Sequence, residues 1–208
     1  MERENSYVEE RRQRTEPNER AELVPASARV RRRMIVLGAI VATMWFLEIV
    51  DVLLLQQRLN ALGVRPRTGT GLWGILFMPL LHGSLAHVAA NTLPFLVLGW
   101  LVIMRRLSDF LVVTAVVMIV SGTGVWLFGA GSTVSIGASG LVFGYFGYLL
   151  LRGYFERSAS SILIAALVLL FYGGMFWGVL PQGAGISWEA HLFGFAGGVL
   201  AAWLLARR

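Results

Sequence analysis

The sequence predicts an all-α membrane protein built from six transmembrane helices. Of its 208 residues, 56% are hydrophobic and only 14% are charged, whereas a soluble domain is about half apolar and about one quarter charged. A helix that crosses a bilayer needs about 20 apolar residues, or fewer if it does not reach both surfaces. Six such runs follow one another, at residues 34–55, 88–104, 109–129, 138–151, 160–180 and 189–206.

The first 33 residues differ from the rest of the chain. Residues 1–33 mix arginine and glutamate with almost no large apolar side chains, so they cannot bury a core and are predicted to form a mobile tail. We expect no signal peptide, because the first apolar run is too long for one. Residues 34–208 then form one compact domain, and the absence of cysteine excludes disulfides and thiol chemistry.

The arginines predict the orientation of the helices. All 18 basic residues are arginine, and most of them lie at the ends of the apolar runs. Positively charged residues remain on the cytoplasmic side of a membrane, so both termini are predicted to be cytoplasmic. This distribution indicates control of topology and not nucleic-acid binding. The arginines that six spans place together are the tail cluster, Arg105, Arg106, Arg152, Arg157, Arg207 and Arg208.

The first outer loop is unusually long and apolar. It covers about residues 56–87 and contains LWGILFMPLLHGSLAH, which is too apolar for a solvated loop. A long loop inside a compact domain is usually functional. We expect short helices lying partly in the bilayer interface, with Trp73 as an anchor.

Three polar residues are predicted to lie at one depth in the bilayer. Counting from the cytoplasmic arginine of each helix at 1.5 Å per residue, Asn91 lies at about 21 Å, Ser139 at about 20 Å and His191 at about 24 Å. The hydrocarbon core is about 30 Å thick. The non-helical segment 130–137 must also lie at membrane depth, which is tolerated only where backbone lines a cavity or is buried in protein. The sequence therefore predicts a water-filled pocket that opens outward.

The same three residues can perform acyl transfer. A serine alone is most often a packing residue, but Ser139 has a candidate base in His191, which can accept its proton and return it to the leaving amine. His87 and Asn91 are spaced i, i+4 and share a helix face. Their side chains, with the backbone N–H of Ser139, can stabilise an oxyanion.

A third member of a catalytic triad is not evident. Glu189 is two residues from His191 and points away from it on a helix. It is interpreted as a first-turn acid that complements the helix dipole, after Ser187 as the cap. Glu48 and Asp51 are intramembrane acids, which are functional candidates by default. Their more favoured role is to pair with Arg58, Arg65 or Arg67.

A metal site is the competing interpretation. Three histidines, His82, His87 and His191, together with Glu189 could bind zinc, which commonly takes three protein ligands in catalytic sites. However, His82 and His87 are spaced i, i+5, a poor pairing on a helix face, and no HExxH motif occurs. The sequence therefore favours a site without a metal or cofactor.

The motifs together resemble the rhomboid family of intramembrane serine proteases. The resemblance covers about residues 34–206. It rests on three motifs in matching order: His82-x4-His87-x3-Asn91, Gly137-Ala138-Ser139-Gly140 and Ala190-His191-x2-Gly194-x3-Gly198.

The resemblance implies a Ser139–His191 dyad without an acid, and an oxyanion hole formed by His87, Asn91 and the Ser139 amide. His82 would be structural, and Gly194 and Gly198 would pack the sixth helix against the fourth. The fifth helix and the loop after it would act as a lateral gate and cap. The implied substrates are single-span membrane proteins in the lipid bilayer of a bacterial plasma membrane. The oligomeric state stays open.

Two departures from the family pattern are visible. Some bacterial members carry tyrosine four residues after the serine, where this chain has Phe143, which keeps a ring face but loses the hydroxyl. Some have Trp-Arg in the first loop, where this chain has Trp73-Gly74.

Gly137 and Gly140 would free the backbone around the nucleophile.

Two other function classes stay open. A non-catalytic rhomboid-like protein that binds membrane helices would have the same fold, although such relatives usually lack the serine or the histidine. A transporter would use Glu48, Asp51 and the cavity, but the sequence contains no evident inverted repeat.

Overall fold

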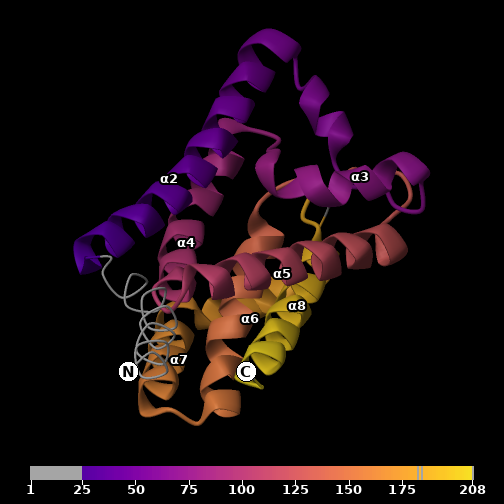
Figure 1. The fold of residues 1–208 in the computed structure, drawn as a ribbon. Coiled ribbons are helices and arrows are strands. Elements are labelled where there is room, and N and C mark those ends of the chain that lie inside the picture. Colours follow the sequence, from indigo (N-terminus) through magenta and orange to yellow (C-terminus); the bar gives the residue numbers. More distant parts are fainter. Residues whose placement is uncertain (1–24, 182, 184, 208) are drawn as a thin grey trace, which may run out of the picture. The chain divides into compact units, whose positions relative to one another are not determined.

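The computed structural model describes residues 25–181, 183 and 185–207, and the elements within them are helical (Figure 1). Residues up to Val36 and residues from Leu37 onward form two compact units. The described part of the first unit is the beginning of α2, and the candidate site lies in the second. The elements in chain order are α2 (Ala26–Val50), η1 (Asp51–Leu55), η2 (Arg58–Leu62), α3 (Gly69–Phe77), η3 (Met78–Leu80), α4 (Leu85–Ile103), α5 (Leu107–Phe128), α6 (Ser139–Glu156), α7 (Ala159–Tyr172), η4 (Gly173–Val179) and α8 (Trp188–Ala206).

The all-α architecture predicted from the sequence is confirmed. Each of the six apolar runs coincides with a helix, and five helical segments within the described residues are long and apolar enough to cross a membrane. The remaining run forms α6, whose 18 residues include Arg152 and Glu156 and are therefore less apolar. Its start at Ser139 agrees with the short helix expected there.

The first helix begins earlier than the apolar run. α2 starts at Ala26, directly after Pro25, so residues 26–33 of the charged segment are helical. Alanine and arginine are both strong helix formers, and proline is well suited to a helix start because its φ is already fixed. Most of the predicted mobile tail, residues 1–24, lies outside the described residues.

The first outer loop contains the expected short helices. α3 begins after Thr68, whose hydroxyl accepts a hydrogen bond from the N–H of Gly71 at 3.1 Å. α3 packs closely on the preceding backbone, because a Cβ on Gly71 would overlap the carbonyl oxygen of Arg65 and one on Gly74 would overlap that of Gly63. The loop is joined to the α5–α6 connection by paired backbone hydrogen bonds between Val64 and Ser135.

Small residues hold α6 and α8 together. A Cβ on Gly194 would overlap the carbonyl oxygen of Gly140, and one on Gly198 would overlap that of Gly144. Such close approach of two helix backbones requires glycine. The two glycines of α8 therefore face successive turns of α6, and Figure 1 shows α6 and α8 side by side. This contact fixes the beginning of α6 against the beginning of α8.

Candidate active site

Ser139 and His191 lie within hydrogen-bond distance of each other. The Ser139 hydroxyl oxygen is 2.9 Å from Nε2 of His191, although the two residues are 52 positions apart. Ser139 is the first residue of α6, and His191 lies in the first turn and a half of α8. The histidine is 9% exposed and the serine is partly buried. This distance is suitable for proton transfer between a nucleophile and a base.

Helix α5 supports this pair from behind. The buried hydroxyl of Ser121 donates a hydrogen bond to the carbonyl oxygen of Ala190 at 2.8 Å, directly before His191. A Cβ on Gly140, directly after Ser139, would lie 2.6 Å from the same hydroxyl oxygen. Ser121 therefore contacts the neighbours of both candidate catalytic residues. Ser121 could not be identified from the sequence, because a serine inside an apolar helix has no distinguishing signal.

The second ring nitrogen of His191 also has a partner. Nδ1 lies 2.9 Å from the carbonyl oxygen of Gly178, in η4. If Nδ1 carries the proton, it donates to this carbonyl, and Nε2 is left free to accept the proton of Ser139. A peptide carbonyl thus occupies the position where a triad has a carboxylate. No sequence signal identifies such a partner, because every residue has a carbonyl.

An aromatic ring supports the imidazole from one face. Phe143 stacks on His191 with ring centroids 4.1 Å apart and an angle of 7° between the planes. Phe143 lies one helical turn after Ser139 on α6, so the same helix carries the nucleophile and the support of the base. Phe143 stands where some bacterial members of the family have tyrosine, and it keeps the stacking face although it lacks the hydroxyl.

His87 and Asn91 lie beside the turn that precedes the serine. Gly137 has φ of +116°, and a Cβ there would lie 2.8 Å from the His87 ring and 3.9 Å from Nδ2 of Asn91. Asn91 is 7% exposed, and its Nδ2 donates to the carbonyl oxygen of His87 at 3.1 Å. Both side chains of the expected oxyanion hole are therefore next to the Gly137–Ser139 segment. Gly137 is required both for its φ and for the space that the His87 ring occupies.

His82 lies under the same turn. Its side chain is 1% exposed, and Nε2 accepts a hydrogen bond from the N–H of Ala138 at 3.4 Å. Its ring meets that of His87 edge-on, with centroids 5.0 Å apart. Burial lowers the pKa of His82 to about 4, and the neighbouring His87 adds to this effect. A neutral imidazole is needed for Nε2 to accept this bond, so the low pKa and the contact agree.

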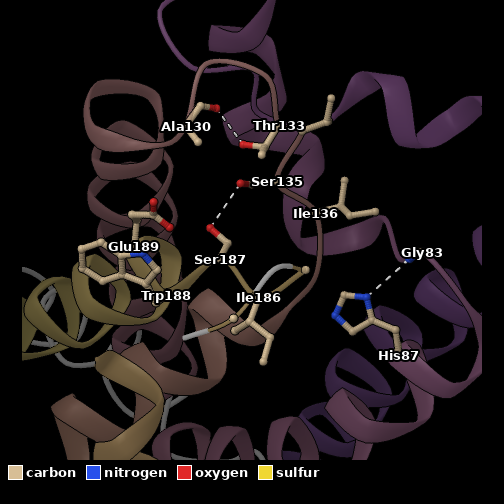
Figure 2. Close-up of a pocket in the computed structure, with 13 residues that line it drawn as sticks. Gly83, His87, Ala130, Thr133, Ser135, Ile136, Ile186, Ser187, Trp188 and Glu189 are labelled. Carbon is tan, nitrogen blue, oxygen red and sulfur yellow. Dashed lines mark hydrogen bonds between the residues drawn. The ribbon is translucent and has the colours of Figure 1, made fainter. Parts of the chain in front are cut away.

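A cavity of about 560 Å³ lies beside His87 (Figure 2), and Ser139 and His191 are not among its lining residues. Its walls come from three segments: the loop around Gly83, the α5–α6 connection and the segment that leads into α8. The hydroxyl of Ser135 donates to that of Ser187 at 3.2 Å and joins two of these walls. The non-helical segment 130–137 lines this cavity, as expected of it, and the water content and bilayer depth of the cavity stay predictions.

Two expectations about polar side chains were wrong. Ser187 precedes α8 but makes no capping hydrogen bond, because its hydroxyl accepts from Ser135 instead. Glu48 and Asp51 are buried, and among the described residues neither forms an ion pair with an arginine. Asp51 instead accepts a hydrogen bond from the N–H of Leu59 at 2.9 Å. The three arginines named for this pairing, Arg58, Arg65 and Arg67, take other positions in the loop.

The zinc alternative receives no geometric support. Within the part of the chain that the structure describes, no three side chains of His, Cys, Asp or Glu lie close enough to hold a metal ion. His82 points at the N–H of Ala138, and both ring nitrogens of His191 already have partners.

Comparison with known proteins places the chain in a family. Residues 69–208 match the model of the rhomboid domain. The chain belongs to the rhomboid family. With five helices of membrane-spanning length and composition among its described residues, this rhomboid chain is an integral membrane protein.

Several relatives are similar over most of this chain. An uncharacterized protein of Mycobacterium tuberculosis is 44% identical over 174 residues, which cover 80% of this chain and 72% of that protein. An uncharacterized protein of Mycobacterium leprae is 42% identical over 173 residues, covering 79% and 68%. RHOMBOID-like protein 4 of Arabidopsis thaliana is 33% identical over 142 residues, covering 65% of this chain and 34% of the plant protein.

The structure also explains why this rhomboid has Trp73-Gly74 where some members of the family have Trp-Arg. The position after Trp73 cannot carry an arginine side chain here, because α3 lies with Gly74 directly on the backbone of Gly63 and Val64. Arg67 instead reaches α5, donating from its guanidinium to the carbonyl oxygens of Leu127 at 3.0 Å and Gly129 at 2.9 Å. An arginine from a different position thus attaches this loop to the helices.

Proposed function

We propose that this rhomboid is an intramembrane serine endopeptidase that cleaves single-span membrane proteins through a Ser139–His191 dyad. The observation that carries the proposal is the 2.9 Å separation of the Ser139 hydroxyl oxygen from Nε2 of His191. A packing serine has no need of an imidazole at this distance. The second ring nitrogen, bonded to a carbonyl, gives the base the tautomer that such a reaction requires.

The proposed reaction has two steps. The Ser139 oxygen attacks the carbonyl carbon of the substrate while Nε2 of His191 takes its proton, and the resulting imidazolium is stabilised by the Gly178 carbonyl. The C–N bond then breaks, and His191 gives the proton to the leaving amine. A water molecule from the cavity, deprotonated by His191, attacks the acyl-enzyme, releases the second product and restores the serine.

The oxyanion of each step is proposed to form beside His87 and Asn91. Both lie against the turn before Ser139, where the N–H at the start of α6 also points outward from a helix N-terminus. Removing one donor from an oxyanion hole typically lowers kcat by about 10²- to 10³-fold. We expect Asn91→Ala to fall in this range.

The proposed setting is a bacterial plasma membrane, with both termini in the cytoplasm and the cavity open to the outer side. The distribution of arginine supports this orientation. The relatives from two mycobacteria support a bacterial source.

The test uses the purified protein in liposomes with a model single-span substrate. Wild type should cleave it, and Ser139→Ala should reduce cleavage to the uncatalysed level. A fluorophosphonate probe should label wild type but neither Ser139→Ala nor His191→Ala. Ser160→Ala is the matched control, because Ser160 is exposed at the start of α7 and should leave labelling unchanged. Equal cleavage by wild type and Ser139→Ala would overturn the proposal in favour of a non-catalytic helix-binding protein.

A further inference from the structure

The outer cavity carries one fixed charge of its own. Its lining combines small residues, three hydroxyl groups and apolar side chains such as Ile136 and Trp188, and Glu189 is the one carboxylate among the described residues that line it. No arginine lines the cavity in the described part of the chain. Figure 2 shows Glu189 on the cavity wall beside Trp188, across from His87.

The carboxylate of Glu189 is not neutralised by a neighbouring side chain. Glu189 is partly buried in the first turn of α8, and no ion pair joins it to another described residue. Arg67 reaches Gly131 near the cavity, but its guanidinium is held by the carbonyl oxygens of Leu127 and Gly129. A carboxylate in a first turn complements the helix dipole, which explains its position but not its place on a cavity wall.

A single charge in such a cavity acts on anything that enters it. Walls of low dielectric focus the field of a charge into a cleft, so it interacts more strongly there than on an open surface. A volume of about 560 Å³ holds several side chains of an extended segment. Hydroxyl groups and apolar side chains share the walls, so the cavity suits an extended segment of mixed polarity.

We propose that Glu189 selects substrates that carry a lysine or arginine in the segment that occupies this cavity, next to the cleaved bond. The inference rests on the proposed proteolysis for the identity of the ligand as a substrate. The carboxylate attracts the ammonium or guanidinium group and repels aspartate and glutamate, so the effect is read as a ratio between matched substrates.

The test compares matched substrates. A single-span substrate with alanine and serine around the cleaved bond is made in three series, in which lysine, glutamate or glutamine is moved through each flanking position in turn. In wild type, lysine at one or more positions should raise kcat/KM about three- to tenfold over glutamine, and glutamate should lower it. The preference should shrink as salt concentration rises.

Each variant is judged by the ratio of its kcat/KM for the lysine substrate to its kcat/KM for the glutamine substrate. A change in overall activity cancels in this ratio. Glu189→Gln should bring the lysine-to-glutamine ratio close to one, and Glu189→Lys should invert the preference. Glu48→Gln is the matched control, because Glu48 is buried on α2 and does not line the cavity. The ratio should remain as in wild type. A lysine preference that persists in Glu189→Gln, or a wild type without any preference, would overturn the inference.

A binding measurement separates this inference from the proposed function. The Ser139→Ala protein is titrated with fluorescent versions of the lysine and glutamine substrates, with and without Glu189→Gln. If wild type cleaves nothing but the lysine substrate binds more tightly and depends on Glu189, the proteolytic function fails and the charge selection stands. If cleavage proceeds and both substrates bind and react equally, the charge selection fails and the proteolytic function stands.

Discussion

The ring of Phe143 lies flat against the imidazole of His191, with centroids 4.1 Å apart and planes only 7° from parallel. Because Phe143 follows Ser139 by one turn of α6, the helix that carries the candidate nucleophile also fixes one face of the candidate base. The other constraints on His191 are in the ring plane: Ser139 at one nitrogen and the Gly178 carbonyl at the other. Together these contacts leave the imidazole little freedom to rotate.

Replacing Phe143 with leucine should affect kcat per folded molecule more strongly than the free energy of unfolding. Aromatic pairs contribute about 0.5–1.5 kcal/mol beyond the area they bury, so kcat should fall about two- to twelvefold. Phe110→Leu is the matched control, because Phe110 is fully buried and packs on Tyr145. It should lower the free energy of unfolding while kcat per folded molecule is retained. Equal effects of both variants on kcat would show that the stacking has no catalytic role.

Placing a methyl group on Gly198 should force α6 and α8 apart. The added Cβ would overlap the carbonyl oxygen of Gly144, and overpacking of this kind typically destabilises by about 2 kcal/mol. Gly38→Ala is the control, since a Cβ on this mid-helix glycine of α2 meets nothing within 4 Å. It should be neutral or slightly stabilising, because alanine is a better helix former by about 1 kcal/mol. Unfolding in mixed detergent micelles measures both, and equal stability of the two variants would contradict the close helix contact.

The pKa of His82 predicts a loss of stability in mild acid. In the folded protein the pKa is about 4, and its ordinary value is 6.5. Between these values the unfolded chain binds a proton that the folded chain does not. Stability is therefore fully present above pH 6.5 and decreases as the pH falls toward 4, by at most about 1.4 kcal/mol per pH unit.

His82→Gln tests this pH dependence. Glutamine retains an acceptor for the N–H of Ala138 but does not titrate, so the free energy of unfolding should fall less steeply between pH 6.5 and pH 4 than it does in wild type. The other acidic groups are common to both proteins and cancel in the comparison. If the two profiles run parallel, His82 is not kept neutral by burial.

Arg67 should attach the first outer loop to α5. Its guanidinium donates to two carbonyl oxygens at the end of that helix, and Arg67→Ala should cost about 1 kcal/mol of stability. Arg65→Ala is the control, because the exposed Arg65 makes its close contacts through its backbone. Limited proteolysis of residues 56–68 should be faster in Arg67→Ala only. Equal cleavage in both variants would indicate that the backbone pairing of Val64 with Ser135 suffices.

The helices and the common level of Ser139 and His191 could be predicted because both follow from one-dimensional quantities. Apolar runs mark spans, and a rise of 1.5 Å per residue converts position into depth. Ser139, the residue that begins α6, was therefore placed at the level of His191 before any contact was known. The start of α2 could not be predicted, since arginine and alanine form helices as readily as apolar residues do and hydropathy does not mark that boundary.

Hydropathy also could not predict where the α-helix in the fifth apolar run ends. Residues 160–180 read as one helix, but α7 ends at Tyr172 and a 3₁₀ segment continues from Gly173. Two adjacent glycines weaken an α-helix without changing its hydropathy. This change of helix type brings the Gly178 carbonyl to His191. The partner of the base thus depends on a backbone transition that spacing alone does not reveal.

Contacts between distant segments account for the remaining differences. Ser187 fits the pattern of a helix cap, but the hydroxyl of Ser135, from another loop, is its partner. Asp51 was expected to pair with an arginine, and it accepts from the N–H of Leu59. In each case the local interpretation was chemically reasonable, and a tertiary neighbour supplied a different partner.

The hydrogen bond from His191 to Gly178 has a consequence for how the sequence can vary in evolution. A carboxylate at this place can be removed by a single base change, whereas a peptide carbonyl is supplied by every amino acid. A substitution at position 178 therefore cannot remove the carbonyl oxygen that His191 contacts. It can only displace this oxygen, because the new side chain would crowd Phe143. A descendant in which position 178 has changed should therefore lose activity through the displaced Phe143 ring and not through a missing acceptor for His191.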